Sequence, residues 1–466
     1  SMNMINVRRL TVMTFLGASM LSGISAQVSP LQVDTLKETK IPDQWDLQSC
    51  IDYAKEQNIT IRKNRITAAS TQIDVKTAKA AMFPSLSFST GHQVVNRPYQ
   101  ETSSRVSGSE IISSNSKTSY NGNYGLNASW TLYNGNKRLK TIQQEKLNNQ
   151  MAELDVATSE NNIQESIAQV YIQILYAAES VKVNENTLQV SIAQRDRGQE
   201  LLSAGSIAKS DLAQLEAQVS TDRYQLVTAQ ATLEDYKLQL KQLLELDGEN
   251  EMNIYLPALS DENVLAPLPT KRDVYISALS LRPEIEASKL NVEASELGIN
   301  IAKSSYFPTI SLSAGIGTNH TSGSDFTFGE QVKNGWNNSI GLSVSVPIFN
   351  NRQTKSAVQK AKLQYETSML SLLDEQKALY KTIESLWLDA NSAQQRYAAA
   401  NEKLKSTQIS YELISEQFNL GMKNTVELLT EKNNLLQAQQ EQLQAKYMAI
   451  LNTQLLKFYQ GDQLAL

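Results

Sequence analysis

The chain contains the same succession of segments twice, and this internal repetition limits its possible folds more than any other feature. Three blocks recur in one order: MFPSLSFSTG (82–91) and YFPTISLSAG (306–315), YGLNASWTLYNGNKRLK (124–140) and IGLSVSVPIFNNRQTKS (340–356), and LLSAGSIAKSDLAQLEAQ (201–218) and QFNLGMKNTVELLTEKN (from 417). Self-similarity of this kind marks one structural unit that is used repeatedly. We therefore expect two repeats, at 44–247 and 274–466, joined by a Pro-punctuated connector at 248–273.

Each repeat contains two segments in which apolar and small polar residues alternate, as in strands whose two faces differ. The four segments lie at about 83–96, 119–133, 307–319 and 338–349. The apolar face includes Leu126, Trp130, Ile340, Leu342, Val344 and Val346, whereas Ser, Asn, Thr and Gly dominate the other face. Each segment has ~10 residues, the length that a tilted strand needs to cross a bilayer. We expect the apolar face to contact lipid and the polar face to line a wide, water-filled barrel.

Aromatic residues stand at the ends of the strands that adjoin the predicted helices. They are Phe83, Tyr133, Phe307 and Phe349, and they are consistent with a girdle at one membrane interface. A soluble sandwich would show the same alternation, but it needs about seven strands and the sequence offers four. Four strands cannot close, and an open edge in lipid leaves unpaired backbone groups that cost several kcal/mol each. We therefore expect other copies of the chain to complete the barrel.

Long polar segments with a regular apolar spacing predict helical hairpins over 136–247 and 350–460. In the first hairpin, apolar residues recur every seven positions, at Leu212, Val219, Leu226, Leu233 and Leu240. Asp222 is the single polar exception at the second heptad position. Heptads of this kind indicate knobs-into-holes packing between helices. Gly205 and Gly421 stand where each hairpin needs a left-handed helix stop.

The first residues read as a secretory signal peptide at 1–26, followed by an N-terminal extension at 27–43. Arg8 and Arg9 precede a short apolar stretch, and small residues surround Ala26. An uncleaved membrane anchor is the alternative. Beyond this segment the sequence contains no apolar run long enough to predict a transmembrane helix. We expect an exported protein.

The composition argues against catalysis and against nucleic-acid binding. The formal net charge is −5, and no basic stripe interrupts the sequence. The single cysteine, Cys50, cannot form an internal disulfide, and the two histidines, His92 and His320, are too far apart in sequence to suggest a metal site. We find no nucleophile–histidine pairing and no phosphate loop, so we expect neither an enzyme nor a cofactor.

These features together resemble the TolC-type outer membrane efflux proteins. The resemblance rests on the "FP" that opens one strand of each repeat, on strands that pass directly into long helices, and on the Gly-containing tips; it extends from about Trp45 to Gly461. It implies an α+β membrane protein: a homotrimer with a twelve-stranded barrel in the outer membrane of a Gram-negative bacterium. It also implies a helical barrel in the periplasm, which would meet a periplasmic adaptor and an inner-membrane transporter. The implied function is the exit duct of a tripartite efflux or type I secretion system.

The resemblance also assigns roles at the two helix tips. It places a gate at Glu427 and Thr430, where the family carries acids, and a latch between Lys423 and Asp211, where the family uses Arg and an acid. The alternative for Glu427 is an ordinary capping box with Asn424. The tips that would dock an adaptor are Ala204, Gly205, Ser206, Leu420, Gly421 and Met422.

The loops at 97–118 and 320–336 are rich in Ser, Asn and Gly, and we expect them to be extracellular. Two other functions fit part of the sequence. A stand-alone porin would explain the strands but not the helices, and a non-conducting periplasmic coiled-coil or adaptor protein would explain a hairpin but not the strands.

Overall fold

The computed structural model describes residues 40–101, 103–107, 110–114, 117–249 and 251–466, and residues 44–466 form one compact unit. The predicted signal peptide at 1–26 lies outside the described residues, as does nearly all of the extension at 27–43.

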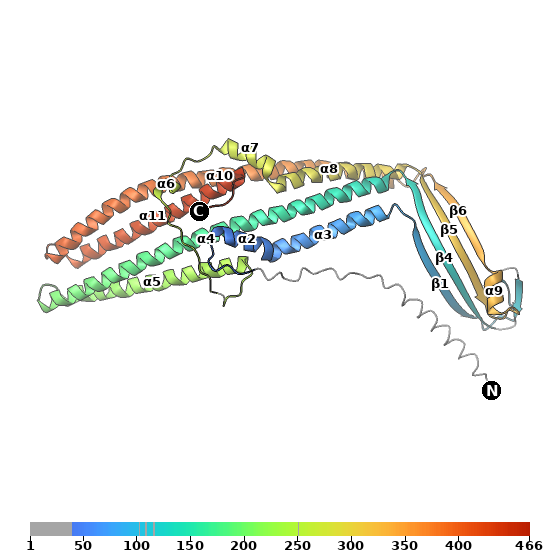
Figure 1. Cartoon of the computed structure of the whole chain (residues 1–466), viewed down its shortest axis with the longest axis horizontal. Coiled ribbons are helices and arrows are strands. Elements are labelled where there is room, and N and C mark those ends of the chain that lie inside the picture. Colours follow the sequence, from blue (N-terminus) through green and yellow to red (C-terminus); the bar gives the residue numbers. More distant parts are fainter. Residues whose placement is uncertain (1–39, 102, 108–109, 115–116, 250) are drawn as a thin grey trace, which may run out of the picture. The chain divides into compact units, whose positions relative to one another are not determined.

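A four-stranded antiparallel sheet brings the strands of both halves together (Figure 1). The strands lie in the order β1 (Ser85–Asn96), β4 (Thr118–Asn134), β5 (Thr309–Thr321) and β6 (Asn337–Ser345). The first three begin and end within a few residues of the predicted bounds. The prediction for the fourth was wrong at its end, because β6 stops at Ser345 instead of continuing to 349. Pro347 has no N–H to donate to a ladder, so the pairing ends just before it.

The strand register places the apolar residues of all four strands on one face. Leu86 lies opposite Ala128, which lies opposite Ala314, which lies opposite Ile340. The opposite face carries mainly Ser, Asn, Gly and Thr, and none of the four strands contains Asp, Glu, Lys or Arg. The sheet therefore has one apolar face and one polar, uncharged face.

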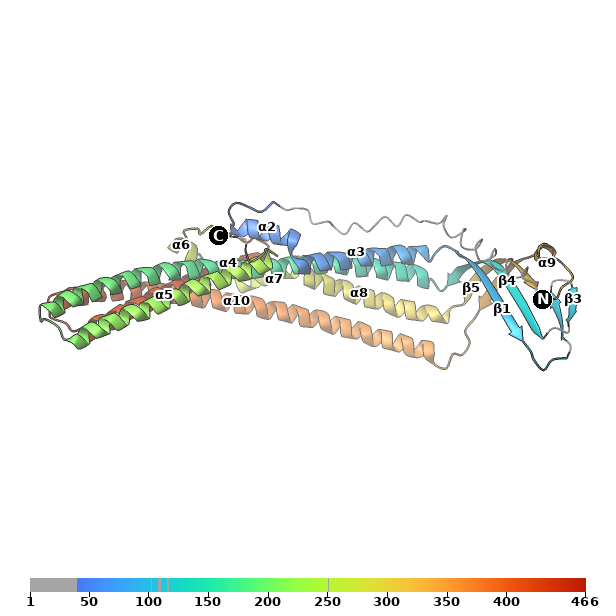
Figure 2. The same cartoon turned by 90° about the horizontal axis from the view of Figure 1, so that it is seen from below.

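Four helices join the sheet at one of its ends. They are α3 (Ile59–Ala80) before β1, α4 (Lys137–Ser203) after β4, α8 (Pro283–Lys303) before β5 through the short η2 (Ser304–Tyr306), and α10 (Gln353–Asn419) after β6. They pack in the order α3, α4, α8, α10, so that their order follows that of the strands. Figure 2 shows α3, α4, α8 and α10 running along one another.

Both strand-to-helix connections that lead into the long helices turn through two consecutive left-handed residues. These are Gly135 and Asn136 before α4, with φ of 70° and 63°, and Asn351 and Arg352 before α10, with φ of 55° and 67°. A Cβ atom at Gly135 would lie 2.6 Å from the carbonyl oxygen of Ser304, so glycine is required there for space as well as for conformation.

The long helices α4 and α10 fold back into α5 (Lys209–Leu243) and α11 (Thr425–Gln460), which gives two antiparallel hairpins. Each long helix has 67 residues, which corresponds to ~100 Å. Of the predicted heptad residues of α5, Leu212, Val219 and Leu240 are buried. Asp222 is buried too, although it is charged.

The middle of the helical part holds the largest buried apolar cluster, to which α4, α11 and the short α2 (Leu47–Gln57) contribute. The connector crosses this region and contains α6 (Asp261–Val264) and the start of α7 (Lys271–Leu281). Side chains of α10 hold it in place: the Gln394 amide donates to the carbonyl of Ala266 at 2.8 Å, and the Trp387 indole donates to that of Pro269 at 3.1 Å.

The two segments predicted as loops at the far end of the sheet both contain regular structure. Segment 97–118 includes a hairpin of β2 (Ser103–Ser107) and β3 (Glu110–Ser114), and segment 320–336 includes α9 (Phe328–Asn334). A capping box accounts for α9: the hydroxyl of Thr327 accepts from the N–H of Glu330, whose carboxylate accepts from the N–H of Thr327. Among the helices that the structure describes, none combines the length and the apolar character that crossing a bilayer requires.

Candidate functional site at the helix tips

The first tip, between α4 and α5, is a glycine turn. Gly205 adopts φ of +72°, as predicted, and the N–H of Ser206 donates to the carbonyl of Leu201 at 2.8 Å. This bond closes the C-terminus of α4 as in a Schellman motif. Asp211 then begins α5 by accepting from the backbone N–H of Ala208 at 3.0 Å. The carboxylate of Asp211 therefore has a hydrogen-bond partner within its own tip.

The second tip, between α10 and α11, repeats this geometry and adds a full capping box. Gly421 has φ of +73°, and the N–H of Met422 donates to the carbonyl of Gln417 at 2.8 Å. The side chain of Asn424 accepts from the N–H of Glu427 at 2.8 Å, and the carboxylate of Glu427 accepts from the N–H of Asn424 at 3.1 Å. The sequence-based interpretation of Asn424 and Glu427 as a helix cap is confirmed.

The predicted gate residues have partners inside one chain. Nζ of Lys423 lies 3.0 Å from Oε1 of Glu427, and Thr430 donates its hydroxyl to the carbonyl of Val426 in its own helix at 2.7 Å. The hydrogen bond from the N–H of Asn424, followed by the contact with Lys423, lowers the pKa of Glu427 below its ordinary value. Lys423 contacts Glu427 in this structure, and the latch between Lys423 on one tip and Asp211 on the other stays a prediction.

The residues predicted to dock an adaptor lie at the surface of the two tips. Leu420 and Met422 are 74% and 69% exposed, which is high for apolar side chains. A Cβ atom added at Gly205 or Gly421 would meet nothing within 4 Å. Both turns are thus open to contact from outside the chain.

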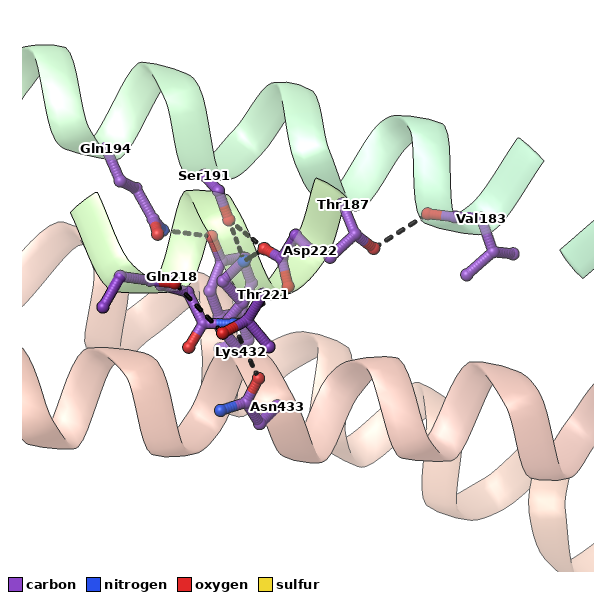
Figure 3. Close-up of polar contacts among 11 residues, drawn as sticks. Val183, Thr187, Ser191, Gln194, Gln218, Thr221, Asp222, Lys432 and Asn433 are labelled. Carbon is purple, nitrogen blue, oxygen red and sulfur yellow. Dashed lines mark hydrogen bonds and ion pairs between the residues drawn. The ribbon is translucent and has the colours of Figure 1, made fainter. Parts of the chain in front are cut away.

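The sequence analysis did not predict a buried polar cluster, which lies between the tips and the middle of the helical part. Ser191 of α4, Asp222 of α5 and Lys432 of α11 point toward one another, and both Ser191 and Lys432 contact the carboxylate of Asp222 (Figure 3). The one signal in the sequence was Asp222 itself, the polar exception in an apolar heptad. Its partner on α11 lies 210 residues further along the chain.

At the other end of the chain, the strand residues predicted to face lipid share one face of the sheet. Ile340, Leu342 and Val344 are exposed in the single chain, and Leu126 and Trp130 are less so. Val346 is exposed too, but it lies beyond the end of β6 at Ser345, so the prediction that it is a strand residue was wrong. The indole of Trp130 donates to the carbonyl of Met82 at 2.8 Å, beside the predicted aromatic girdle. Of that girdle, Phe83, Phe307 and Phe349 are exposed and Tyr133 is half-buried.

The sheet also brings together the two histidines, whose separation in sequence had argued against any cluster. The rings of His92 and His320 lie with their centroids 6.4 Å apart, near Tyr120 and Tyr124, toward the loop end of the apolar face. Throughout the described part of the chain, no group of three or more His, Cys, Asp and Glu side chains is placed to hold a metal ion. The two histidines and the two tyrosines form an aromatic cluster at the end of the strands that lies away from the helices.

Comparison with known protein families finds a match to this chain. The profile of the family described as "Outer membrane efflux protein" matches residues 50–245 and 274–461. The outer membrane efflux protein BepC of Brucella suis is 24% identical over 294 residues, which cover 63% of this chain and 61% of BepC. The outer membrane protein TolC of Escherichia coli is also 24% identical over 294 residues, or 61% of this chain and 58% of TolC. These alignments span less than two thirds of either relative.

Solved structures extend the likeness of fold to nearly the whole chain. A crystal structure of CusC, from a study of its folding and transmembrane channel formation, superposes with a TM-score of 0.76 at 18% identity. The superposition covers 91% of this chain and 96% of CusC.

Proposed function

Because this chain belongs to the outer membrane efflux protein family, we propose that it is the outer membrane channel of a tripartite efflux or type I secretion system. It would conduct substrates passively from a periplasmic adaptor and an inner-membrane transporter to the outside. The sheet would lie in the outer membrane and the helices in the periplasm.

The observation that carries this proposal is the division of the sheet into an apolar and a polar, uncharged face. The apolar face suits contact with lipid. The Ser, Asn, Gly and Thr residues of the other face suit a water-filled interior. A passive duct needs a polar wall and an end that can close, and it needs no catalytic group. The paired tips supply candidates for that end.

The incomplete edges of the chain support assembly into a closed ring. Within the described residues, β1 and β6 each pair on one side only, and α3 and α10 stand at the matching ends of the helix order. Helix α3 carries exposed isoleucines seven residues apart, at Ile59, Ile66 and Ile73. Helix α10 carries exposed leucines with the same spacing, at Leu363 and Leu370. Because β1 and β6 run antiparallel to each other, β1 of one copy can pair with β6 of the next. A homotrimer would close a twelve-stranded barrel and leave no edge in lipid.

The element order supports the division into two repeats. In each half a helix leads into a strand, a second strand leads into a 67-residue helix, and a glycine turn leads into a returning helix. We assign 44–247 and 274–466 to the repeats and 248–273 to the connector on this basis.

The tips are the proposed gate and docking surface. Three copies of Glu427 would form a ring of carboxylates at the periplasmic mouth, which favours cations. Lys423 and Asp211 would latch neighbouring tips, and Thr430 would narrow the ring without adding charge. The exposed turns around Gly205 and Gly421, with Leu420 and Met422, would receive the adaptor.

Single-channel recording of the purified full chain in a planar bilayer tests the proposed function. We expect extraction to require detergent, and a small, cation-selective conductance. A protein that is soluble without detergent, or that never conducts, would contradict the proposal and favour a periplasmic coiled-coil role. A large resting conductance without cation selectivity would favour a stand-alone porin.

A further inference from the structure

The buried cluster of Ser191, Asp222 and Lys432 joins three helices of both hairpins at one level. The three residues are 2%, 2% and 3% exposed, so the ion pair is withdrawn from water. Asp222 receives Lys432 and Ser191 on one carboxylate oxygen, and the amide of Gln218 donates to the other at 2.9 Å. Figure 3 shows these side chains converging from α4, α5 and α11. All three polar groups thus have partners in this one arrangement.

Further polar contacts link the two hairpins beside this cluster. The amide of Gln218 on α5 reaches Oδ1 of Asn433 on α11 at 3.4 Å, and the amide of Gln194 on α4 donates to the hydroxyl of Tyr411 on α10 at 2.8 Å. The cluster and these two bonds form a polar layer that includes all four helices of the two hairpins.

Apolar side chains lie on both sides of this polar layer. Toward the tips, Leu215 of α5 and Leu428 of α11 are fully buried, and on the other side Leu188 of α4 and Leu435 of α11 are buried. Apolar contacts tolerate sliding of one helix along another, because one leucine can replace the next. An ion pair does not, since a shift of one turn would leave a lysine and an aspartate buried apart from each other.

The electrostatics of Lys432 agree with this dependence on position. Burial lowers the pKa of Lys432 from its ordinary value, and the contact with Asp222 opposes that effect. The contact with Asp222 therefore favours the charged form of Lys432 in the interior.

We infer that the Ser191–Asp222–Lys432 cluster is a lock inside each chain, which holds α11 and the second tip in one register against the α4–α5 hairpin. The lock differs from the latch between Lys423 and Asp211, because it is buried, lies within one chain and acts above the tips. Its consequence for gating rests on the proposed function: release of the lock would let the second tip move away from the first and widen the mouth.

Distance measurement between the tips tests the lock without relying on conduction. Spin labels at Ser206→Cys and Met422→Cys report the separation of the two tips within one chain, provided that labelled chains are diluted with unlabelled ones. Cys50 can stay, because it is fully buried and burial raises the pKa of its thiol to about 12. Three backgrounds are compared with the unmodified chain: Asp222→Asn, Asp222→Leu with Lys432→Met, and Lys403→Ala with Glu441→Ala.

Each background has a distinct role. Asp222→Asn leaves Lys432 buried without a counter-charge, whereas the leucine–methionine pair removes both charges and keeps an apolar contact that preserves folding. The Lys403–Glu441 pair is the control, because it also involves α11 but is half-exposed and joins α10 to α11 within one hairpin.

We expect a single narrow tip-to-tip distance in the unmodified chain and in the control, and a clearly broader distribution in both Asp222 variants. The leucine–methionine variant should keep its unfolding temperature, which separates loss of register from loss of stability. A narrow distribution in either Asp222 variant, or equal broadening in the control, would overturn the lock. Conductance of the same proteins should rise several-fold where the distances broaden; broadening in a protein that never conducts would sustain the lock and contradict the proposed function alone.

Discussion

The guanidinium of Arg282 and the carboxylate of Glu165 meet inside the helical part, with Nη1 3.2 Å from Oε1, although 117 residues separate them in the chain. Arg282 is 6% exposed and also binds Glu284 through Nε at 2.7 Å. Its guanidinium lies over the ring of Tyr459, 4.1 Å from the centroid. The side chain of Arg282 thereby connects three helices: α4, α11 and the first turn of α8.

Replacement of Arg282 by Met should destabilise the chain strongly. Burial already raises the pKa of Glu165 above its ordinary value, and the positive charge of Arg282 opposes that effect. Without Arg282, two carboxylates lose their counter-charge in the interior, and the expected loss is about 3–5 kcal/mol in the free energy of unfolding. Denaturant titration of the purified protein measures it. The control Lys182→Ala breaks an exposed pair with Glu179 and should cost about 0–1 kcal/mol; similar losses in the two variants would contradict the prediction.

The order of the second tip should depend on pH through Glu427. The folded pKa of this carboxyl lies below its ordinary 4.5, so its contribution to stability is present above that value and is lost as pH falls through the folded pKa. Hydrogen exchange of the first amides of α11, corrected for its intrinsic pH dependence, should show protection at about pH 6 and less at about pH 3. Glu427→Gln should remove this pH dependence. Equal protection at both pH values in the unmodified chain would show that the cap does not rely on the charge.

The two hairpin helices that start at the tips should respond in opposite directions to matched cap substitutions. Asn424 caps α11 with its side chain, whereas α5 starts at Ala208, which has no side-chain acceptor. Asn424→Ala should cost about 1 kcal/mol of local stability, and Ala208→Asn should add up to a similar amount. Hydrogen exchange at the first turns of α11 and α5 measures both, and each variant serves as the control for the other. A change of the same sign in both would contradict this account.

Loss of the proposed latch should open the mouth. Lys423→Ala combined with Asp211→Ala should raise the single-channel conductance several-fold, because two tips would lose their attraction. Lys209→Ala is the control, since it removes a positive charge from the first tip without touching either latch residue. Unchanged conductance in the double variant would contradict the latch. The contact with Glu427 would then be the interaction that remains assigned to Lys423.

The edges of the sheet should pair between copies. Ser87→Cys on β1, combined in turn with Cys at Ser339, Ser343 or Ser345 on β6, should give covalent dimers and trimers on oxidation for the pair that lies in register. All four positions belong to the polar face, where an oxidant in water can reach them. Ser129→Cys in place of Ser87→Cys is the control, because β4 is already paired on both sides. Products larger than three chains would contradict a closed trimer.

Local patterns in the sequence predicted the local structure well. Alternation located the strands, and the tip glycines have the expected left-handed conformation. The end of β6 was misplaced because the alternation continues through Pro347, which cannot pair. The hairpin of β2 and β3 was missed because its polar residues resemble those of a loop.

Contacts between distant parts of the chain could not be predicted in this way. The partner of Asp222 and the partners of Arg282 are set by how the hairpins and the connector pack, and no periodicity records that packing. His92 and His320 meet because β1, β4 and β5 are neighbours and because Gly122 between them has no side chain. For Asp222 and for the two histidines, the useful sequence signal was a polar residue at a position where the local pattern calls for an apolar one.

The four strands β1, β4, β5 and β6 carry no Asp, Glu, Lys or Arg, and this affects which solutes the proposed barrel can distinguish. Charges elsewhere in the protein are screened over a Debye length of about 8 Å at physiological ionic strength. An ion inside the barrel section would therefore feel almost no net field from the wall or from the distant helix tips. Charged residues adjoin the two ends of this section, where Arg97 and Lys117 flank the strands on one side and Arg138 binds the carbonyl of Leu132 on the other. Between these ends, anions and cations of equal size should move equally fast, so the middle of the lipid-spanning duct would sort solutes by width.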